Sequence, residues 1–483
     1  MLNKTDFFTK NFWKLYFIII VASTIAYVGI IGGETVWTDE AFTFAMMKNT
    51  FVKMCKITAN DVHPPLYYIL LKAFTAPFKH SLVSAKLFSI ATCVITIAFG
   101  GYQIKKMVNV KTALAFMILY LFFPFMLIYS IEVRMYALSA MFVFMAGVYA
   151  YKVFSEEKKR NIVLYALYTL CAAYTHYYAL IASGIIFLEL LFFVIYYKKE
   201  KIKQVLLSLL AMGVVYLPWL LVLLAQVREK KENGYWIGEI TMETVKGYWL
   251  SVFGARYISF FPWISSMLFI AAMVYAVIRI NKKEIILALC FMAVPLGTLL
   301  IGVGASVAIQ PVFVIRYIVP AIPLLILFLA IATSSIRNNI VYGIVITIFI
   351  VGGLANYVGV YKQEYDLYPS AMTKEKLVKY DVDGYMVYAN TAITPVLGYY
   401  VDDKPIYTLR TYDKKSNPFK NLYIIKNVND QKKKKLLFFN WLGLKPSAQI
   451  LKKYDSEYVG VFFIEGNWAD VYILNRKNSK SRS

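Results

Sequence analysis

The chain has 483 residues, of which 59% are hydrophobic and 17% charged, and its formal net charge is +24. This is more apolar surface than one soluble core can bury, so the composition excludes an ordinary soluble protein and predicts a membrane protein. Much of the positive charge sits in short loops between apolar runs, which favours membrane topology and anionic lipid over nucleic acid as its cause.

Apolar stretches long enough to cross the bilayer recur along the first three quarters of the chain. The first, after Lys14, is too long for a cleaved signal peptide and is interpreted as an uncleaved span. The fifth and sixth are separated only by Thr175 and His176 and could form one tight hairpin. The expected fold class is therefore an all-α polytopic protein of about eleven spans, which are 12–32, 82–103, 112–129, 135–154, 162–174, 178–197, 205–225, 261–280, 285–304, 317–333 and 340–357.

Alternate short loops between the apolar stretches are rich in lysine and arginine, which predicts that they face the cytoplasm together with the N-terminal tail. They include 105–111, 158–160, 198–203 and 279–283. The other set, around 130–134 and 175–177 and near Arg316, is poorer in these residues and is assigned to the outer face. The longer outer segments 48–86 and 228–246 contain lysines, but long segments obey this rule less strictly.

The segment between the first two spans is too apolar for a free loop. Residues 41–58 and 66–76 are expected to be helices lying along the membrane interface, within an outer loop of about 38–80. After residue 361 the composition changes, and 385–390, 405–409, 421–426, 458–465 and 470–475 are typical of short strands. Residues 362–483 are therefore expected to form a small extracytoplasmic α/β domain. Within it, the run 432–441 is interpreted as an amphipathic helix, either with a solvated lysine face or in contact with lipid headgroups.

Two acids, Asp39 and Glu40, follow the first span where the chain leaves the membrane. Asp39 could cap a helix over 41–58 while Glu40 pairs with the helix dipole, and a catalytic role is compatible with both. The next polar cluster, Asp61-Val-His63-Pro-Pro, holds an acid and an imidazole on a backbone that two prolines make rigid. Capping alone would explain Asp61 but not His63.

Further ionisable residues recur at predicted span ends. Glu132 and Arg134 lie at an outer turn, followed by Tyr136, and the two could simply form an isolated local ion pair with each other. His176 could be an ordinary interfacial histidine, and Arg316 could anchor its span by snorkelling.

The predicted topology places all of these residues on the same outer face, where ionisable groups at the membrane usually mark a site. Carboxylates could activate a nucleophile or hold a cation such as Mg or Mn, and arginines could neutralise a phosphate. Aromatic residues, among them Tyr67 and Trp236, offer faces for a sugar or prenyl group. The four cysteines show neither metal spacing nor a disulfide pattern.

The same motifs carry a resemblance. Trp-Thr-Asp-Glu at 37–40, Asp-Val-His-Pro-Pro-Leu-Tyr-Tyr at 61–68, Glu-Val-Arg-Met-Tyr at 132–136, Thr-His-Tyr-Tyr at 175–178 and Arg-Tyr-Ile-Val-Pro at 316–320 are similar to motifs of the GT-C glycosyltransferases. The resemblance is to the group of protein O-mannosyltransferases and bacterial aminoarabinose transferases, and it covers residues 12–357. It implies a polyprenyl-phosphate sugar donor, transfer at the outer face, Asp39 as catalytic base, and Arg134 and Arg316 as donor-phosphate contacts.

The resulting hypothesis is an inverting sugar transfer to an extracytoplasmic lipid, protein or glycan acceptor. Glu40, Asp61 and His63 are assigned to the acceptor or a cation, with Asp39 and Asp61 as the ligands of any metal. Glu132, Tyr136, His176, Tyr67 and Trp236 are assigned supporting roles. The alternatives are a transporter or flippase of lipid-linked sugars, which often contains repeated halves, and a structural or receptor protein.

Overall fold

The computed structural model describes residues 5–477 except 33–35, 234–236, 255–260, 281, 363, 366–369, 389–391, 402, 410–414, 426, 429–430 and 465–466. Contacts between Cα atoms divide the chain into two compact units. The first contains residues 1–31, 62–70 and 83–361, and the second contains 32–61, 71–82 and 362–483. Trp236, to which the sequence assigned a supporting role, lies outside the described residues.

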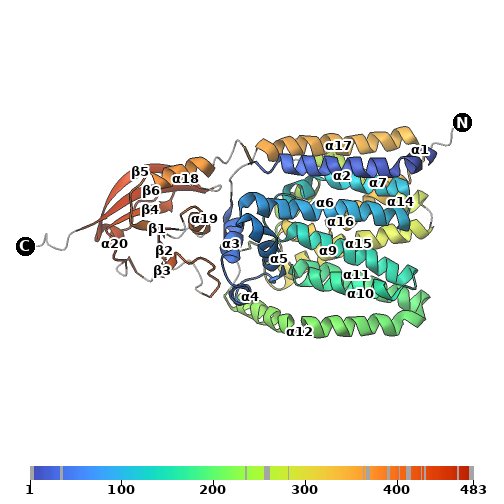
Figure 1. Cartoon of the computed structure of the whole chain (residues 1–483), viewed down its shortest axis with the longest axis horizontal. Coiled ribbons are helices and arrows are strands. Elements are labelled where there is room, and N and C mark those ends of the chain that lie inside the picture. The colour runs from blue at the N-terminus through green and yellow to red at the C-terminus, as the bar shows by residue number, and fades with distance from the viewer. Residues whose placement is uncertain are drawn as a thin grey trace, which may run out of the picture. The chain divides into compact units, whose positions relative to one another are not determined.

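The first unit is a bundle of long helices that run side by side in Figure 1. All eleven apolar stretches contain helix, which confirms the predicted all-α membrane class. Among the described residues, eight helical segments are long and apolar enough to cross a membrane, and shorter apolar helices accompany them. The helices are α1 (Thr5–Lys10), α2 (Phe12–Gly29), α6 (Leu82–Met107), α7 (Val110–Phe122), α8 (Pro124–Tyr129), α9 (Tyr136–Ser155), α10 (Lys159–Ala173), α11 (Tyr177–Tyr197), η2 (Lys199–Lys201), α12 (Ile202–Asn233), α13 (Met242–Phe253), α14 (Phe261–Arg279), α15 (Lys282–Ala308), η3 (Ile315–Ala321), α16 (Ile322–Ser334) and α17 (Asn339–Lys362).

Burial separates central from peripheral helices. In α16 every residue from Ile322 to Thr333 is buried, because α7, α9, α14 and α15 all pack against it. In α2, by contrast, Phe17, Val21 and Ile25 are exposed along the helix. An apolar side chain in that position is stable only against lipid, so α2 lies at the surface of the bundle in the membrane.

Small residues allow one close helix contact. A side chain at Gly353 of α17 would meet the backbone oxygen of Phe122, at the end of α7, at 2.6 Å. The neighbouring Gly352 faces the ring of Phe261. Close approach over small residues is a common way for helices to associate in membranes.

The second unit contains the helices after the first span and the C-terminal domain. They are α3 (Thr38–Met47), α4 (Phe51–Ala59), η1 (Ala76–Phe78), α18 (Ser370–Val378), α19 (Ile393–Tyr400) and α20 (Ala448–Leu451), and α5 (Leu66–Thr75) runs from the first unit into the second. The expected helix 66–76 is confirmed by α5. The expected single helix 41–58 is wrong, because the chain breaks at residues 48–50 and Thr50 Oγ1 accepts from Lys53 N to start a new helix, α4.

The C-terminal domain holds a six-stranded sheet with the order β3-β2-β1-β4-β6-β5. Its strands are β1 (Gly384–Tyr388), β2 (Ile406–Leu409), β3 (Leu422–Ile425), β4 (Lys435–Trp441), β5 (Tyr454–Ile464) and β6 (Asn467–Arg476). The first four pair in parallel, and β6 joins β4 and β5 in antiparallel register. The predicted α/β domain is thus confirmed, with its five expected strands near their expected places.

The expected amphipathic helix over 432–441 is wrong. Residues 435–441 form β4, a central strand in which Leu436, Leu437, Phe438 and Phe439 are completely buried. A continuous apolar run is typical of a strand covered on both faces, and this tertiary cover overrides the helical pattern. Lys434 and Lys435 mark its start, where both backbone N–H groups donate to the carboxylate of Asp383.

Candidate functional site

Two histidines from separate predicted motifs meet inside the first unit. His63 and His176 are both buried, and their ring centroids are 5.7 Å apart. Pro64 and Pro65 connect His63 to the first residue of α5, Leu66. Leu66 N donates to Tyr174 O at 3.1 Å, which attaches the start of α5 to the turn between α10 and α11. The two prolines therefore hold His63 at that turn.

Aromatic rings surround His176. Its centroid lies 5.7 Å from that of Tyr136, at the start of α9, and 5.2 Å from that of Tyr317 in η3. Tyr317 in turn stacks on Tyr178 at 5.0 Å. Residues that are far apart in the sequence thus share one contiguous cluster, named here the histidine–tyrosine cluster: His63, Tyr136, His176, Tyr178 and Tyr317.

The hydrogen bonding of His176 defines its tautomer. Nδ1 accepts from Tyr178 N at 3.1 Å, so that the side chain caps α11 and the neutral ring carries its proton on Nε2. Burial holds the pKa of His176 well below its usual value, and electrostatic interactions with His63, Arg134 and Arg316 lower it further. The imidazole is therefore neutral at physiological pH and offers one N–H donor.

Both predicted arginines lie beside this cluster. Arg134 is buried between α8 and α9 and donates to the hydroxyl of Tyr68 at 3.3 Å. Arg316, in η3, holds its guanidinium 6.0 Å from the ring centroid of Tyr317. Both guanidinium groups interact electrostatically with Tyr136 and His176.

The remaining predicted residues of this unit support the same region. Glu132 precedes Arg134, its carbonyl accepts from Ser89 Oγ at 2.7 Å, and its carboxylate interacts with Tyr136. Tyr67 is fully buried, and its ring packs on Tyr68. The structure therefore brings together His63, Tyr67, Glu132, Arg134, Tyr136, His176 and Arg316 in the first unit.

The two arginines give this region positive charge in surroundings of low polarity, where electrostatic attraction is stronger than in water. A guanidinium matches the geometry of a phosphate, and aromatic faces accept apolar or sugar groups. Chemically, the cluster is suited to an anion attached to an apolar or carbohydrate group.

Asp39, Glu40 and Asp61 belong to the second unit. The helix that carries the acidic pair begins at Thr38, so Asp39 lies inside its first turn and is not the cap expected from the sequence. Glu40 is buried and its carboxylate accepts from Trp37 N at 3.3 Å, closing the start of α3. Asp61 follows α4, and its backbone N–H donates to Thr58 O at 3.1 Å. Both acids of the pair thus stand at a helix N-terminus.

Contacts within the second unit attach α3 to the C-terminal domain. Thr38 Oγ1 donates to Ala392 O at 2.8 Å, and the rings of Phe44 and Tyr399 lie 5.1 Å apart. Near the end of α3, Asn49 Nδ2 donates to Pro418 O at 2.9 Å. The residue before Asp39 is therefore held by the C-terminal domain.

Three further residues of interest were not predicted from the sequence. Tyr178 and Tyr317 complete the histidine–tyrosine cluster, and only their place next to His176 and Arg316 could have pointed to them. Lys86 is buried and donates through Nζ to Ile31 O at 3.1 Å. Its position inside an apolar span was a usable signal, because an ionisable residue there usually has a function.

Among the described residues, no three His, Cys, Asp or Glu side chains gather as metal ligands.

These features define a multi-pass membrane protein with a GT-C fold. The structure is similar to that of ArnT from Cupriavidus metallidurans in the apo state, with a TM-score of 0.61 at 9% identity over 94% of this chain and 97% of that one. It is also similar to the structure of ArnT from the same organism bound to undecaprenyl phosphate, with a TM-score of 0.64 at 11% identity over 95% and 97%. No protein-family model and no curated protein sequence matches the chain.

Proposed function

We propose that the protein is a membrane glycosyltransferase that moves a sugar from a polyprenyl-phosphate donor to an acceptor outside the cytoplasm. The observation that carries this proposal is the pair of arginines beside the buried histidine–tyrosine cluster, on a fold shared with a protein whose structure contains undecaprenyl phosphate. The N-terminus would then be cytoplasmic and the C-terminal domain extracytoplasmic, as the lysine-rich loops predict.

In the proposed reaction, Asp39 takes the proton of an acceptor hydroxyl or amine as its oxygen or nitrogen attacks the anomeric carbon. The bond from that carbon to the phosphate oxygen breaks, the oxygen keeps the electron pair, and the configuration at carbon inverts. Arg134 and Arg316 stabilise the negative charge of the departing polyprenyl phosphate. Glu40, Asp61 and His63 orient the acceptor or hold a divalent cation such as Mg or Mn.

A neutral His176 suits this assignment. Because its Nδ1 is occupied by Tyr178 N, only Nε2–H is available to donate to a phosphate or sugar oxygen. Tyr136 and Tyr67 then supply aromatic surface beside the two guanidinium groups.

The test uses the purified full chain, a radiolabelled polyprenyl-phosphate sugar and candidate acceptors. Asp39→Asn should reduce transfer by about 10²–10⁴-fold, the usual contribution of a general base. Asp381→Asn, at an exposed acid of the C-terminal domain, is the matched control. Unimpaired turnover by the Asp39→Asn protein would refute the assignment of the base.

A second pair of variants tests the phosphate contacts. Arg134→Gln and Arg316→Gln should each weaken binding of polyprenyl phosphate, because each removes a cation from a region of low dielectric. Binding of the sugar-free lipid phosphate is measured directly, so that the result does not depend on knowing the acceptor. Unchanged affinity for polyprenyl phosphate in both variants would contradict the proposed donor site. In a separate assay, net movement of the intact donor across the membrane of vesicles that contain the protein would favour a flippase.

A further inference from the structure

A second region of the first unit has the features of a binding site. A cavity of about 580 Å³ lies between the far end of α9, the second half of α11 and the first half of α15. It is distinct from the histidine–tyrosine cluster, because Phe154, which lines it, is separated from Tyr136 by about 27 Å along α9 at 1.5 Å per residue. The size is typical of small-ligand pockets.

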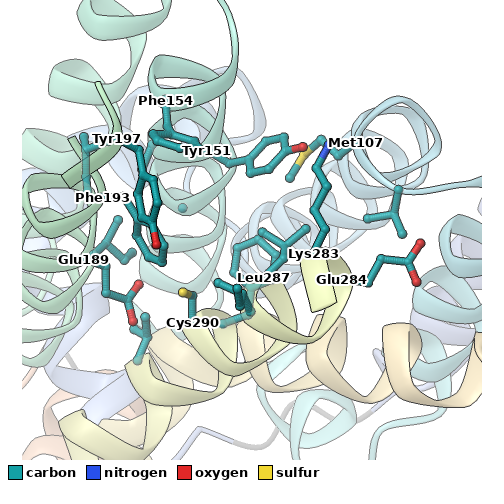
Figure 2. Close-up of a pocket in the computed structure, with 18 residues that line it drawn as sticks. Met107, Tyr151, Phe154, Glu189, Phe193, Tyr197, Lys283, Glu284, Leu287 and Cys290 are labelled. Carbon is teal, nitrogen blue, oxygen red and sulfur yellow. The ribbon is translucent and has the colours of Figure 1, made fainter. Parts of the chain in front are cut away.

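The walls are mostly apolar, and two carboxylates are among the lining residues. Glu284 of α15 lies beside Lys283 in Figure 2, and Glu189 enters from α11. Glu189 lies on the helix face that also carries Ile186, Phe193 and Tyr197, all of which line the cavity. The opposite face, with Leu188 and Phe192, is exposed. The 3.6-residue helical period therefore directs Glu189 into the cavity, next to Cys290, as Figure 2 shows.

A carboxylate in an apolar span is costly unless a partner compensates it. Within the described part of the chain, Glu189 has no hydrogen bond or ion pair. Lys283 also lines the cavity, but its side chain extends toward Met107 and away from Glu189 (Figure 2). The chain itself thus leaves Glu189 available to a cation from outside.

Aromatic rings adjoin this carboxylate. Phe193 and Tyr197 stack one helical turn apart, with centroids 6.0 Å apart and an interplanar angle of 22°, and both line the cavity above Glu189 in Figure 2. A carboxylate combined with aromatic faces in an apolar pocket is the arrangement that recognises organic cations, through ion pairing and cation–π attraction.

We propose that this cavity binds a cationic amphiphile, a molecule with one protonated amine on an apolar chain. The amine pairs with Glu189 beside Phe193 and Tyr197, and the chain occupies the apolar space toward Leu287 and Cys290. This site is independent of the proposed transfer reaction, since it shares no residue with the histidine–tyrosine cluster.

The test is photolabelling of the full chain in phosphatidylcholine nanodiscs. The probe is dodecylamine with a diazirine in its chain, the matched probe is the corresponding dodecanol, and labelled peptides are identified by mass spectrometry. The amine probe should label α9, α11 and α15, and unlabelled dodecylamine should compete. Labelling elsewhere, or equal labelling by both probes, would overturn the proposal.

Two variants test the site itself. Glu189→Gln keeps the size of the side chain and should weaken competition by the amine about tenfold or more, leaving labelling by the alcohol unchanged. Cys290→Phe keeps the carboxylate but fills the cavity, and should reduce labelling by both probes. Glu229→Gln, at an exposed position of α12, should behave as the unaltered protein. Competition that is unchanged in both Glu189→Gln and Cys290→Phe would reject the site.

Discussion

Single side chains in this protein often satisfy backbone groups that a helix end leaves open. Lys201 is the clearest case outside the proposed site. It is 4% exposed, and its Nζ donates to Val153 O at 2.8 Å and to Glu156 O at 2.9 Å, at the end of α9. It also pairs with Glu157 at 3.0 Å. One lysine therefore closes the C-terminus of α9, where the last carbonyls have no partner within the helix.

Replacing this lysine should destabilise the bundle. Lys201→Met keeps the apolar stem but removes the donors, so we expect a loss of about 1–3 kcal/mol, the cost of leaving a buried acceptor unsatisfied. Thermal unfolding of the purified protein in detergent measures the change. Lys199→Met, at an exposed lysine two residues earlier, should have almost no effect; equal effects of the two variants would contradict this role.

The buried His176 predicts a specific dependence of stability on pH. Its pKa is lowered in the folded state, so below about pH 6.5 the unfolded chain binds a proton that the folded chain does not, and stability falls as the pH falls. His176→Asn retains a capping acceptor for α11 but cannot titrate, and should flatten this dependence between pH 7 and 5.

The measurement is the unfolding free energy at several pH values. The largest contribution expected from one histidine is about 1.4 kcal/mol per pH unit. His80 is less buried, and His80→Asn should change the slope less. If the dependence of the unfolding free energy on pH is the same in His176→Asn, the histidine binds its proton as readily in the folded protein as in the unfolded chain, which would contradict this prediction.

At the scale of elements, α3 is important because it carries Asp39 and is held by the C-terminal domain. Asn49, just beyond its end, is buried and donates to both Ala45 O and Pro418 O. This bridge joins residues that are 369 positions apart in the chain. The C-terminal domain therefore contributes to fixing the helix on which the proposed base stands.

Asn49→Ala should separate this attachment from general stability. Loss of a buried donor that serves two carbonyls should cost about 1–3 kcal/mol and increase proteolytic cleavage in the segment around Pro418. Asn60→Ala, whose amide donates locally to Lys56 O, is the control. Equal cleavage of the two variants would mean that Asn49 does not hold the domain to α3.

At the scale of the whole molecule, the charge of the loops predicts how the chain is oriented. In a background without the four native cysteines, a cysteine at Lys445 should react with a membrane-impermeant maleimide in intact cells, because the C-terminal domain is placed outside the cytoplasm. A cysteine at Lys199 should react only after permeabilisation. The opposite pattern would reverse the proposed topology and with it the outer-face location of the site.

The sequence by itself determined the membrane class, the apolar stretches and the C-terminal strands, because length, hydropathy and alternation are local properties. It also selected His63, Arg134, His176 and Arg316, since ionisable groups at span ends are rare. Only the tertiary structure decided that β4 is a strand, because its burial on both faces comes from distant segments. It alone revealed the ring contact between His176 and Tyr317 and the attachment of α3 to α19, since such contacts depend on packing between residues far apart in the chain.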